Sequence, residues 1–186
     1  INMEYMFSNS GFKYVKFTKT YKFYINNINY TFSNSSLISL DVSSFETSKI
    51  TMMFCVFYNS TKLKSIENIN FNISLIESMF SMFYYLLDLR NLTSSKYPID
   101  MQYTFYACFN LKNIIFPQKE IIKLKEMSNM FVSCAKLTSL DLSIFETSQV
   151  KFMYRLFIGC SKLKYINFTN FNTSIMQNLG TFTCNV

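Results

Sequence analysis

The apolar positions of this chain form one pattern that recurs along nearly its whole length, most regularly in residues 137–162. The pattern begins with the spacing L-x-x-L-x-L, at Leu137, Leu140 and Leu142. This spacing is typical of a short strand with one face turned inward. After a turn, apolar residues recur three or four positions apart, at Val150, Met153, Phe157 and Cys160. The second spacing is helical, so the pattern predicts a unit of strand, turn and short helix.

Two columns of residues fix the length of the unit. The first apolar residue of each predicted strand recurs in steps of 25, 26, 26, 22, 26 and 26, at Phe12, Leu37, Leu63, Leu89, Leu111, Leu137 and Leu163. A phenylalanine late in each predicted helix shows the same single short step of 22, at Phe7, Phe32, Phe57, Phe83, Phe105, Phe131, Phe157 and Phe182. Because so small a unit cannot bury its own apolar face, it must stack on copies of itself. We therefore predict about seven repeats of 22–26 residues in one domain over residues 1–186.

The repeat predicts an α/β fold, a leucine-rich-repeat solenoid. The strands are expected to form a parallel β-sheet on the concave face, with short helices on the convex face. A serine before each helical stretch, such as Ser48 or Ser148, is the expected helix N-cap. Beside the leucines and phenylalanines, the expected core contains a methionine column of Met3, Met53, Met79, Met101, Met127 and Met153. Methionines also suit a pliable binding groove, but their place on the buried helical phase favours core packing.

The repeats resemble a known family. The segments LISLDVSSFETSKI at residues 37–50 and LTSLDLSIFETSQV at residues 137–150, each followed by a methionine and then a phenylalanine at fixed spacing, resemble BspA-type leucine-rich repeats, the DUF285 set described from mycoplasmas, other bacteria and parasitic protists. The resemblance covers essentially residues 1–184, and it implies a surface-exposed adhesion or recognition module. One repeat, residues 89–110, departs from the pattern because it lacks four residues of the usual turn and carries Pro98.

Composition excludes several kinds of chemistry. The chain has no histidine, so Ser-His and Cys-His nucleophile pairs and histidine metal sites are ruled out. Asp41 and Asp141 fall at the same strand position four repeats apart, roughly 19 Å by the spacing of strands, which is too far for a catalytic pair. With three glycines there is no glycine-rich phosphate loop. We therefore expect a protein that is not an enzyme and needs no cofactor or metal.

The net charge and the apolar runs limit which partners and which cellular location are expected for the protein. No apolar run approaches the ~20 residues that a membrane span needs. The net charge of +7 permits nucleic-acid binding, but no recognised nucleic-acid motif accompanies it, so no nucleic-acid partner is expected. The chain starts at Ile1 and ends at Val186 inside predicted helices, which indicates a fragment of a longer repeat array. The lack of a signal or anchor sequence is therefore uninformative.

Four of the five cysteines share one column of the repeat. They are Cys108, Cys134, Cys160 and Cys184, and earlier repeats place Ser10, Ser35 and Ser60 there. The column thus favours a small residue. Parallel side chains on adjacent turns suit disulfide geometry poorly. We expect free, buried thiols rather than disulfides or a metal ladder.

The most suggestive surface feature is a basic column. The first outward position of the predicted strands is basic in five of seven repeats, at Lys13, Lys64, Arg90, Lys112 and Lys164, and neutral at Ile38 and Thr138. Tyr14 and Tyr165 flank it at the second outward position. Like charges on neighbouring strands destabilise a sheet, so the column needs an explanation. It is either a binding stripe for an anionic partner or a solvated edge that keeps the repeat array soluble.

Two functions follow from these features. The first is a recognition or adhesion module at the cell surface or outside the cell, which binds a protein or glycan along the concave sheet. The alternative is a cytoplasmic scaffold, a structural subunit of a larger assembly. Reduced thiols and exposed aromatic residues such as Tyr84 and Tyr85 fit this alternative equally well.

Overall fold

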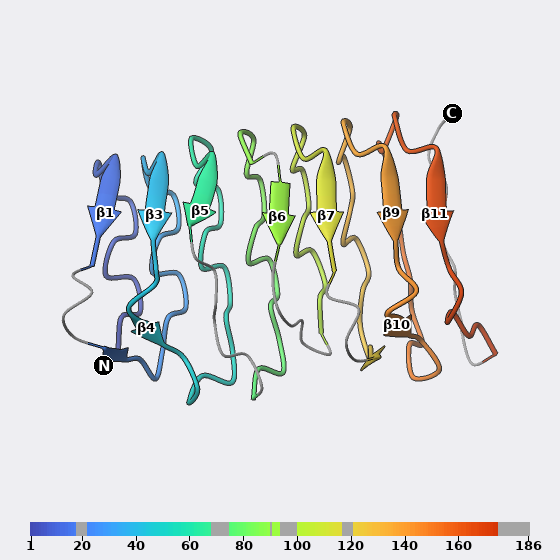
Figure 1. Cartoon of the computed structure of the whole chain (residues 1–186), viewed down its shortest axis with the longest axis horizontal. Coiled ribbons are helices and arrows are strands. Elements are labelled where there is room, and N and C mark those ends of the chain that lie inside the picture. Colours follow the sequence, from blue (N-terminus) through green and yellow to red (C-terminus); the bar gives the residue numbers. More distant parts are fainter. Residues whose placement is uncertain (18–21, 68–74, 90, 94–99, 117–120, 175–186) are drawn as a thin grey trace.

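The computed structural model describes residues 1–17, 22–67, 75–89, 91–93, 100–116 and 121–174. One three-residue strand begins each repeat, and these strands lie side by side in a row (Figure 1): β1 Tyr14–Lys16, β3 Ser39–Asp41, β5 Ser65–Glu67, β6 Asn91–Thr93, β7 Asn113–Ile115, β9 Ser139–Asp141 and β11 Tyr165–Asn167. Shorter strands follow some of them, at β2 Phe23–Tyr24, β4 Phe45–Glu46, β8 Ile122–Lys123 and β10 Phe145–Glu146.

The strands of consecutive repeats pair in parallel. Strands β1, β3 and β5 form one sheet, while β6 pairs with β7 and β9 with β11. The register joins Val15 to Leu40 and Leu40 to Ile66, so residues of the repeat pattern 25 and 26 positions apart meet across the ladder. The short strands pair in the same way, β2 with β4 and β8 with β10. The predicted parallel stacking of repeats is confirmed for these strands.

The first apolar residues of the predicted strands lie in the core, with one exception. The leucines of this column from the second to the sixth repeat are fully buried: Leu37, Leu63, Leu89, Leu111 and Leu137. Leu163 is partly buried against the same core. The prediction is wrong for Phe12, which is 58% exposed. Its ring lies edge-on to Phe7, with 6.3 Å between centroids, at the margin of the core.

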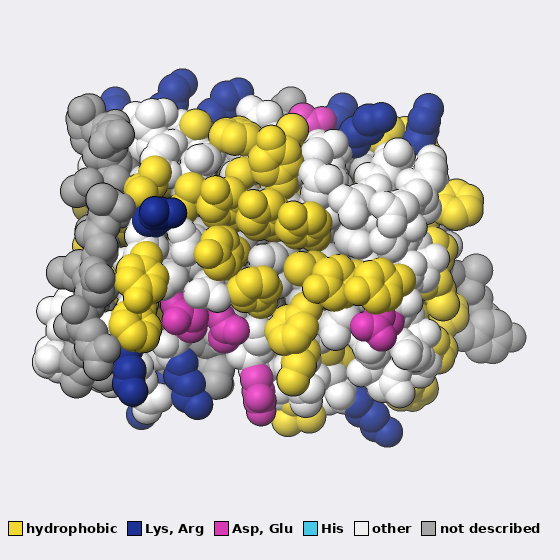
Figure 2. Space-filling view, turned by 180° about the vertical axis from the view of Figure 1, so that it is seen from behind, with side chains coloured by type: hydrophobic (Ala, Val, Ile, Leu, Met, Phe, Trp, Pro, Cys, Tyr) yellow, Lys and Arg dark blue, Asp and Glu magenta, His cyan; other side chains and the backbone are white. Residues whose placement is uncertain are grey.

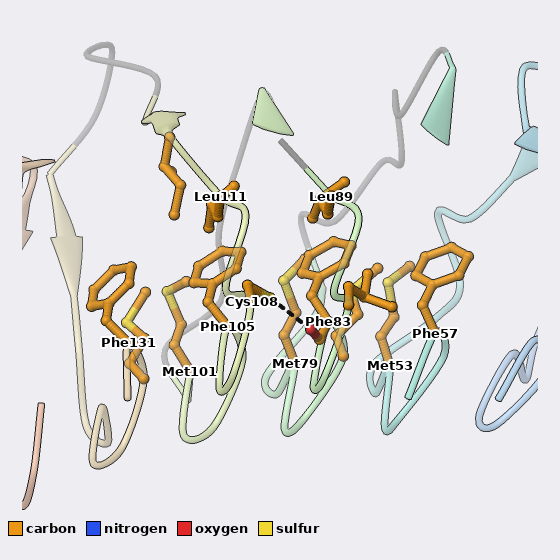
Figure 3. Close-up of a cluster of buried hydrophobic side chains, with 14 of the residues drawn as sticks. Met53, Phe57, Met79, Phe83, Leu89, Met101, Phe105, Cys108, Leu111 and Phe131 are labelled. Carbon is orange, nitrogen blue, oxygen red and sulfur yellow. Dashed lines mark hydrogen bonds between the residues drawn. The ribbon is translucent and has the colours of Figure 1, made fainter. Parts of the chain in front are cut away.

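The methionine and phenylalanine columns lie in the core (Figure 3). All six methionines of the column are buried. The rings of the phenylalanine column stack nearly parallel from Phe7 to Phe157, with neighbouring centroids 5.4–5.8 Å apart. The predicted packing role of both columns is confirmed, while Phe182 lies outside the described residues.

The predicted short helices are wrong. Residues 28–35, 53–60 and 153–160, which carry the helical spacing, form successive tight turns, and the described part of the chain contains no helix. Since no helix follows, Ser48 and Ser148 are not helix N-caps. Instead their backbone amides donate to the carboxylates of Glu46 and Glu146.

Left-handed residues explain why apolar side chains three or four apart do not make a helix here. Each turn segment carries two residues with positive φ, four positions apart, such as Tyr30 at 54° and Asn34 at 51°. Phe32 lies midway between them. An α-helix cannot contain such residues, because each one reverses the twist of the backbone. The backbone reverses its twist at both of these residues in each segment, so the apolar side chains still point into the core.

The turn segments join neighbouring repeats through their backbones. The amides of Tyr30, Phe32 and Asn34 donate to carbonyls of the next repeat, at 2.9, 2.9 and 2.7 Å. The intervening amides of Thr31 and Ser33 donate within their own segment, at 3.2 and 3.1 Å. A helix would direct its amides to its own carbonyls and leave none for a neighbour. The repeats are therefore held together by hydrogen bonds on two faces, here called the sheet face and the turn face.

Candidate binding faces

The predicted basic column is an exposed row on the sheet face. Lys13, Lys64, Lys112 and Lys164 are all exposed, and each lies at the start of a strand. Arg90 lies outside the described residues.

Backbone hydrogen bonds fix the order of this row. The amide of Ile38 donates to the carbonyl of Lys13 at 2.8 Å, and that of Lys64 donates to Ile38 at 3.0 Å. At the other end, the amide of Lys164 donates to Thr138 at 2.9 Å. Ile38 therefore separates Lys13 from Lys64, which places these two lysines about 10 Å apart by the spacing of strands. This separation weakens the repulsion between these two lysines, whereas Lys64, Arg90 and Lys112 occupy consecutive repeats in the sequence.

The two tyrosines that the sequence placed beside the row do not share a site. Tyr14 is 67% exposed on β1 and Tyr165 is 62% exposed on β11. These strands stand at opposite ends of the row in Figure 1. A ligand that contacts both tyrosines must therefore lie across all the strands between them.

The strand residues beside the lysines form a polar floor. Asn113 and Ser139 are exposed, and Ser39 is half-buried. Asp41 and Asp141 lie on β3 and β9, and each accepts the amide two residues later, from Ser43 and Ser143, at 2.9 Å. As predicted, these aspartates belong to strands far apart in the row (Figure 1). They cap the turns that follow the strands.

The described cysteines are buried and free. The thiols of Cys108, Cys134 and Cys160 donate to the carbonyls of Phe83, Phe105 and Phe131 in the preceding repeats, at 3.0, 3.2 and 2.9 Å. Figure 3 shows the bond between Cys108 and Phe83. Ser60 makes the same bond to Phe32 through its hydroxyl. In these four repeats the column holds a small side chain that donates a hydrogen bond to the preceding phenylalanine carbonyl, whereas the hydroxyl of Ser35 bonds that of Ser60. Cys184 lies outside the described residues.

One repeat breaks this rule. The prediction of a small residue is wrong for Leu86, which occupies the column three positions after Phe83 and is fully buried. A leucine has no donor to offer the preceding phenylalanine carbonyl. Apolar contact replaces the hydrogen bond there.

The thiols of Cys108 and Cys134 are held in the protonated form, whereas the hydrogen bond with Cys134 lowers the pKa of Cys160. Burial raises the pKa of the Cys108 thiol to about 12, so this thiol is protonated at neutral pH. Burial also raises the pKa of Cys134. No group of histidine, cysteine or acidic side chains in the described residues is arranged to hold a metal ion. Among these residues, no helical segment could serve as a membrane span.

The turn face carries a surface that the sequence indicated only through Tyr84 and Tyr85. Figure 2 shows a hydrophobic band across this face, with acidic side chains beside it. The rings of Tyr58, Tyr84 and Tyr106 stack there, with centroids 4.8 and 4.6 Å apart. Burial raises the pKa of Tyr84, and the neighbouring tyrosines Tyr106 and Tyr58 raise it further. Its hydroxyl therefore remains neutral.

A signal for this stack was present in the sequence. Each of the three tyrosines directly follows a residue of the phenylalanine column, in the pairs Phe57-Tyr58, Phe83-Tyr84 and Phe105-Tyr106. A helical interpretation would place residues adjacent in sequence about 100° apart around an axis. The turn geometry instead places the phenylalanine inside and the tyrosine on the surface.

These features define a class of protein built from stacked repeats of about 25 residues with parallel strands. The chain belongs to the family described as "Mycoplasma protein of unknown function, DUF285", which it matches over residues 1–115 and 99–183. Neither the curated proteins nor the solved structures that were searched gave a match.

Proposed function

We propose that this chain is a non-enzymatic recognition module, a leucine-rich-repeat solenoid of the BspA type that acts at a cell surface. Its sheet face binds an anionic protein or glycan. The observation that carries the proposal is the row of exposed lysines Lys13, Lys64, Lys112 and Lys164 at the starts of the strands.

The geometry of the row suits an elongated partner. The described lysines recur on every second repeat, about 10 Å apart by the strand spacing, and each presents a compact ammonium group with three hydrogen-bond donors. Carboxylate and sulfate groups are natural acceptors for such donors. A polyanion that lies across the strands contacts several lysines at once, so its affinity exceeds that of a single contact. The polar floor at Asn113 and Ser139 leaves room for it.

A pair of matched variants tests the proposal. The probe is fluorescent dextran sulfate, with neutral dextran as its uncharged counterpart. We expect binding that weakens as salt rises, because it depends on ion pairing. The variant K64S/K112S/K164S should weaken binding at least tenfold at low salt.

The control variant K49S/K125S/K151S removes the same charge from exposed lysines outside the row. It should change the affinity less than threefold. Equal losses in both variants would show that net charge, and not the row, attracts the probe. That result would discard the proposal.

The cell-surface location has its own test. A membrane-impermeant biotin reagent applied to intact source cells should label the exposed lysines, as it labels known surface proteins. Labelling that occurs only after lysis supports the alternative function, a structural subunit of an intracellular assembly. The exposed aromatic residues of the turn face favour that alternative, since a packed assembly would cover them.

A further inference from the structure

The turn face carries a continuous cluster of aromatic side chains, which we call the aromatic patch. Its rings contact one another across three consecutive repeats, with centroid distances of 4.6–6.4 Å: Phe54, Tyr58, Phe80, Tyr84, Tyr85, Tyr103, Tyr106 and Phe109. Stacking inside the patch contributes to stability. Tyr85 and Phe109 nevertheless remain 38% exposed, and they meet edge to face, with their centroids 6.0 Å apart.

Carboxylates border the patch: Glu77 and Asp100 lie on its second and third repeats, and Glu126 lies on the repeat that follows. Glu77 is exposed, and Asp100 and Glu126 are partly exposed. Backbone bridges place Ser78, the neighbour of Glu77, beside Asp100, and Asp100 beside Glu126. Among the described residues, no lysine or arginine forms an ion pair with these three side chains. Figure 2 shows acidic side chains directly below the hydrophobic band.

Part of this acidic row has a local role. Asp100 accepts the hydroxyl of Ser78 at 2.7 Å and the amide of Gln102 at 3.0 Å, and Glu126 accepts the amide of Ser128 at 2.9 Å. No such bond accounts for Glu77. Three carboxylates on adjoining turns repel one another unless a cation lies near them. Their position beside the aromatic patch indicates which cation fits.

We propose that the aromatic patch binds an arginine-rich segment of a partner protein. A guanidinium group stacks on aromatic rings through its planar face and donates paired hydrogen bonds to a carboxylate through its edge. The patch and the acidic row offer both contacts side by side. Charge complementarity selects a basic partner in spite of the net charge of +7, which would repel basic peptides from the rest of the molecule. This binding face is separate from the lysine row of the proposed function.

The test uses fluorescein-labelled hexa-arginine and hexa-lysine peptides, with affinity measured by anisotropy at low salt. We expect saturable binding of hexa-arginine and at least fivefold weaker binding of hexa-lysine, because an ammonium does not stack as a guanidinium does. The variant Y85S/F109S, which leaves the charge unchanged, should weaken hexa-arginine binding at least threefold.

The carboxylates are tested with a matched pair of double variants. E77Q/E126Q removes two charges from the acidic row and should weaken hexa-arginine binding at least fivefold. The control E46Q/E146Q removes two charges from β4 and β10, where each glutamate accepts a serine amide as Glu126 does. Because glutamine keeps an acceptor oxygen, both variants retain these turns. Circular dichroism verifies that each variant folds.

Three results would overturn the proposal. The first is equal weakening by E77Q/E126Q and E46Q/E146Q, which would indicate diffuse attraction. The second is binding that Y85S/F109S does not change. The third is a concentration-dependent dimer of the wild-type protein that Y85S/F109S dissociates, which would make a second copy of the chain the occupant of the patch.

Discussion

The rings of Phe83 and Phe105 lie parallel, with 5.6 Å between centroids and 2° between planes, although 22 residues rather than 25 or 26 separate them. The amide of Phe83 donates to the carbonyl of Thr104 at 3.0 Å, as in the repeats of full length. Both the stack and the backbone ladder thus pass through the shortened repeat without a break. The four missing residues fall between Leu89 and Met101, away from the phenylalanine column.

Truncation of one ring in this column should destabilise the protein strongly. Phe131 is fully buried between Phe105 and Phe157. Replacement with alanine leaves a cavity and removes two ring contacts, so F131A should lower the free energy of unfolding by about 3–5 kcal/mol. Urea unfolding followed by circular dichroism measures the loss. F109A, at a ring that is 38% exposed, should cost far less, and equal costs would contradict the buried stack.

One glycine substitution distinguishes tight turns from a helix by the sign of its effect on the free energy of unfolding. Ala107 has a φ of 56°, a conformation that strains any residue with a β-carbon. Glycine removes that strain, so A107G should raise the free energy of unfolding by roughly 1 kcal/mol. In a helix the same change would lower it by about as much. A thermal unfolding midpoint below that of the wild type would contradict the turn geometry.

Gly159 provides the reverse test in the last described turn segment. Its φ is 75°, and an added β-carbon would lie 3.1 Å from the α-carbon of Ser133. G159A therefore combines backbone strain with a close contact to the preceding repeat, and it should destabilise the protein by at least about 1 kcal/mol. G11A is the control, since nothing lies within 4 Å of the corresponding atom. Urea midpoints of the two variants give the comparison.

The cysteine column should accept serine better than valine. The thiol of Cys134 donates to the carbonyl of Phe105, and serine makes the equivalent bond at Ser60. Valine is apolar and leaves the carbonyl without that donor, which costs about 1–3 kcal/mol. C134V should therefore unfold at lower urea concentration than C134S. The reverse order would show that apolar packing, and not the hydrogen bond, governs this position.

The buried thiol of Cys108 should make stability fall at high pH. Folding raises the pKa of Cys108 from 9.0 to about 12, so the folded state holds its proton where the unfolded chain has lost it. Stability is fully present below pH 9 and declines as the pH rises toward 12, by about 1.4 kcal/mol per pH unit for each such thiol. Urea midpoints at pH 8, 9 and 10 under reducing conditions show the decline. C108S should reduce its slope, and an unchanged slope would contradict the assignment.

The sequence by itself determined the repeat, its length and most of the buried residues. Periodicity was sufficient for this, because side chains that recur in every unit must meet when units stack, as Leu40 meets Ile66 and Phe105 meets Phe131. The lysines of the sheet face could also be predicted, since two residues between inward leucines must point outward. The neutral residues of the same column, Ile38 and Thr138, are equally visible in the sequence.

The tertiary structure alone decided what the second half of each repeat becomes. A spacing of three or four residues fits a helix, and it fits a pair of tight turns with left-handed residues equally well. Backbone amides settle the choice, because in turns the amide of Phe32 and its equivalents reach the next repeat, and in a helix they do not. These hydrogen bonds can form only when the next repeat is already folded against the segment. They also turn Tyr58, Tyr84 and Tyr106 outward into the aromatic patch, whereas the Phe-Tyr pairs of the sequence do not by themselves say which ring lies inside.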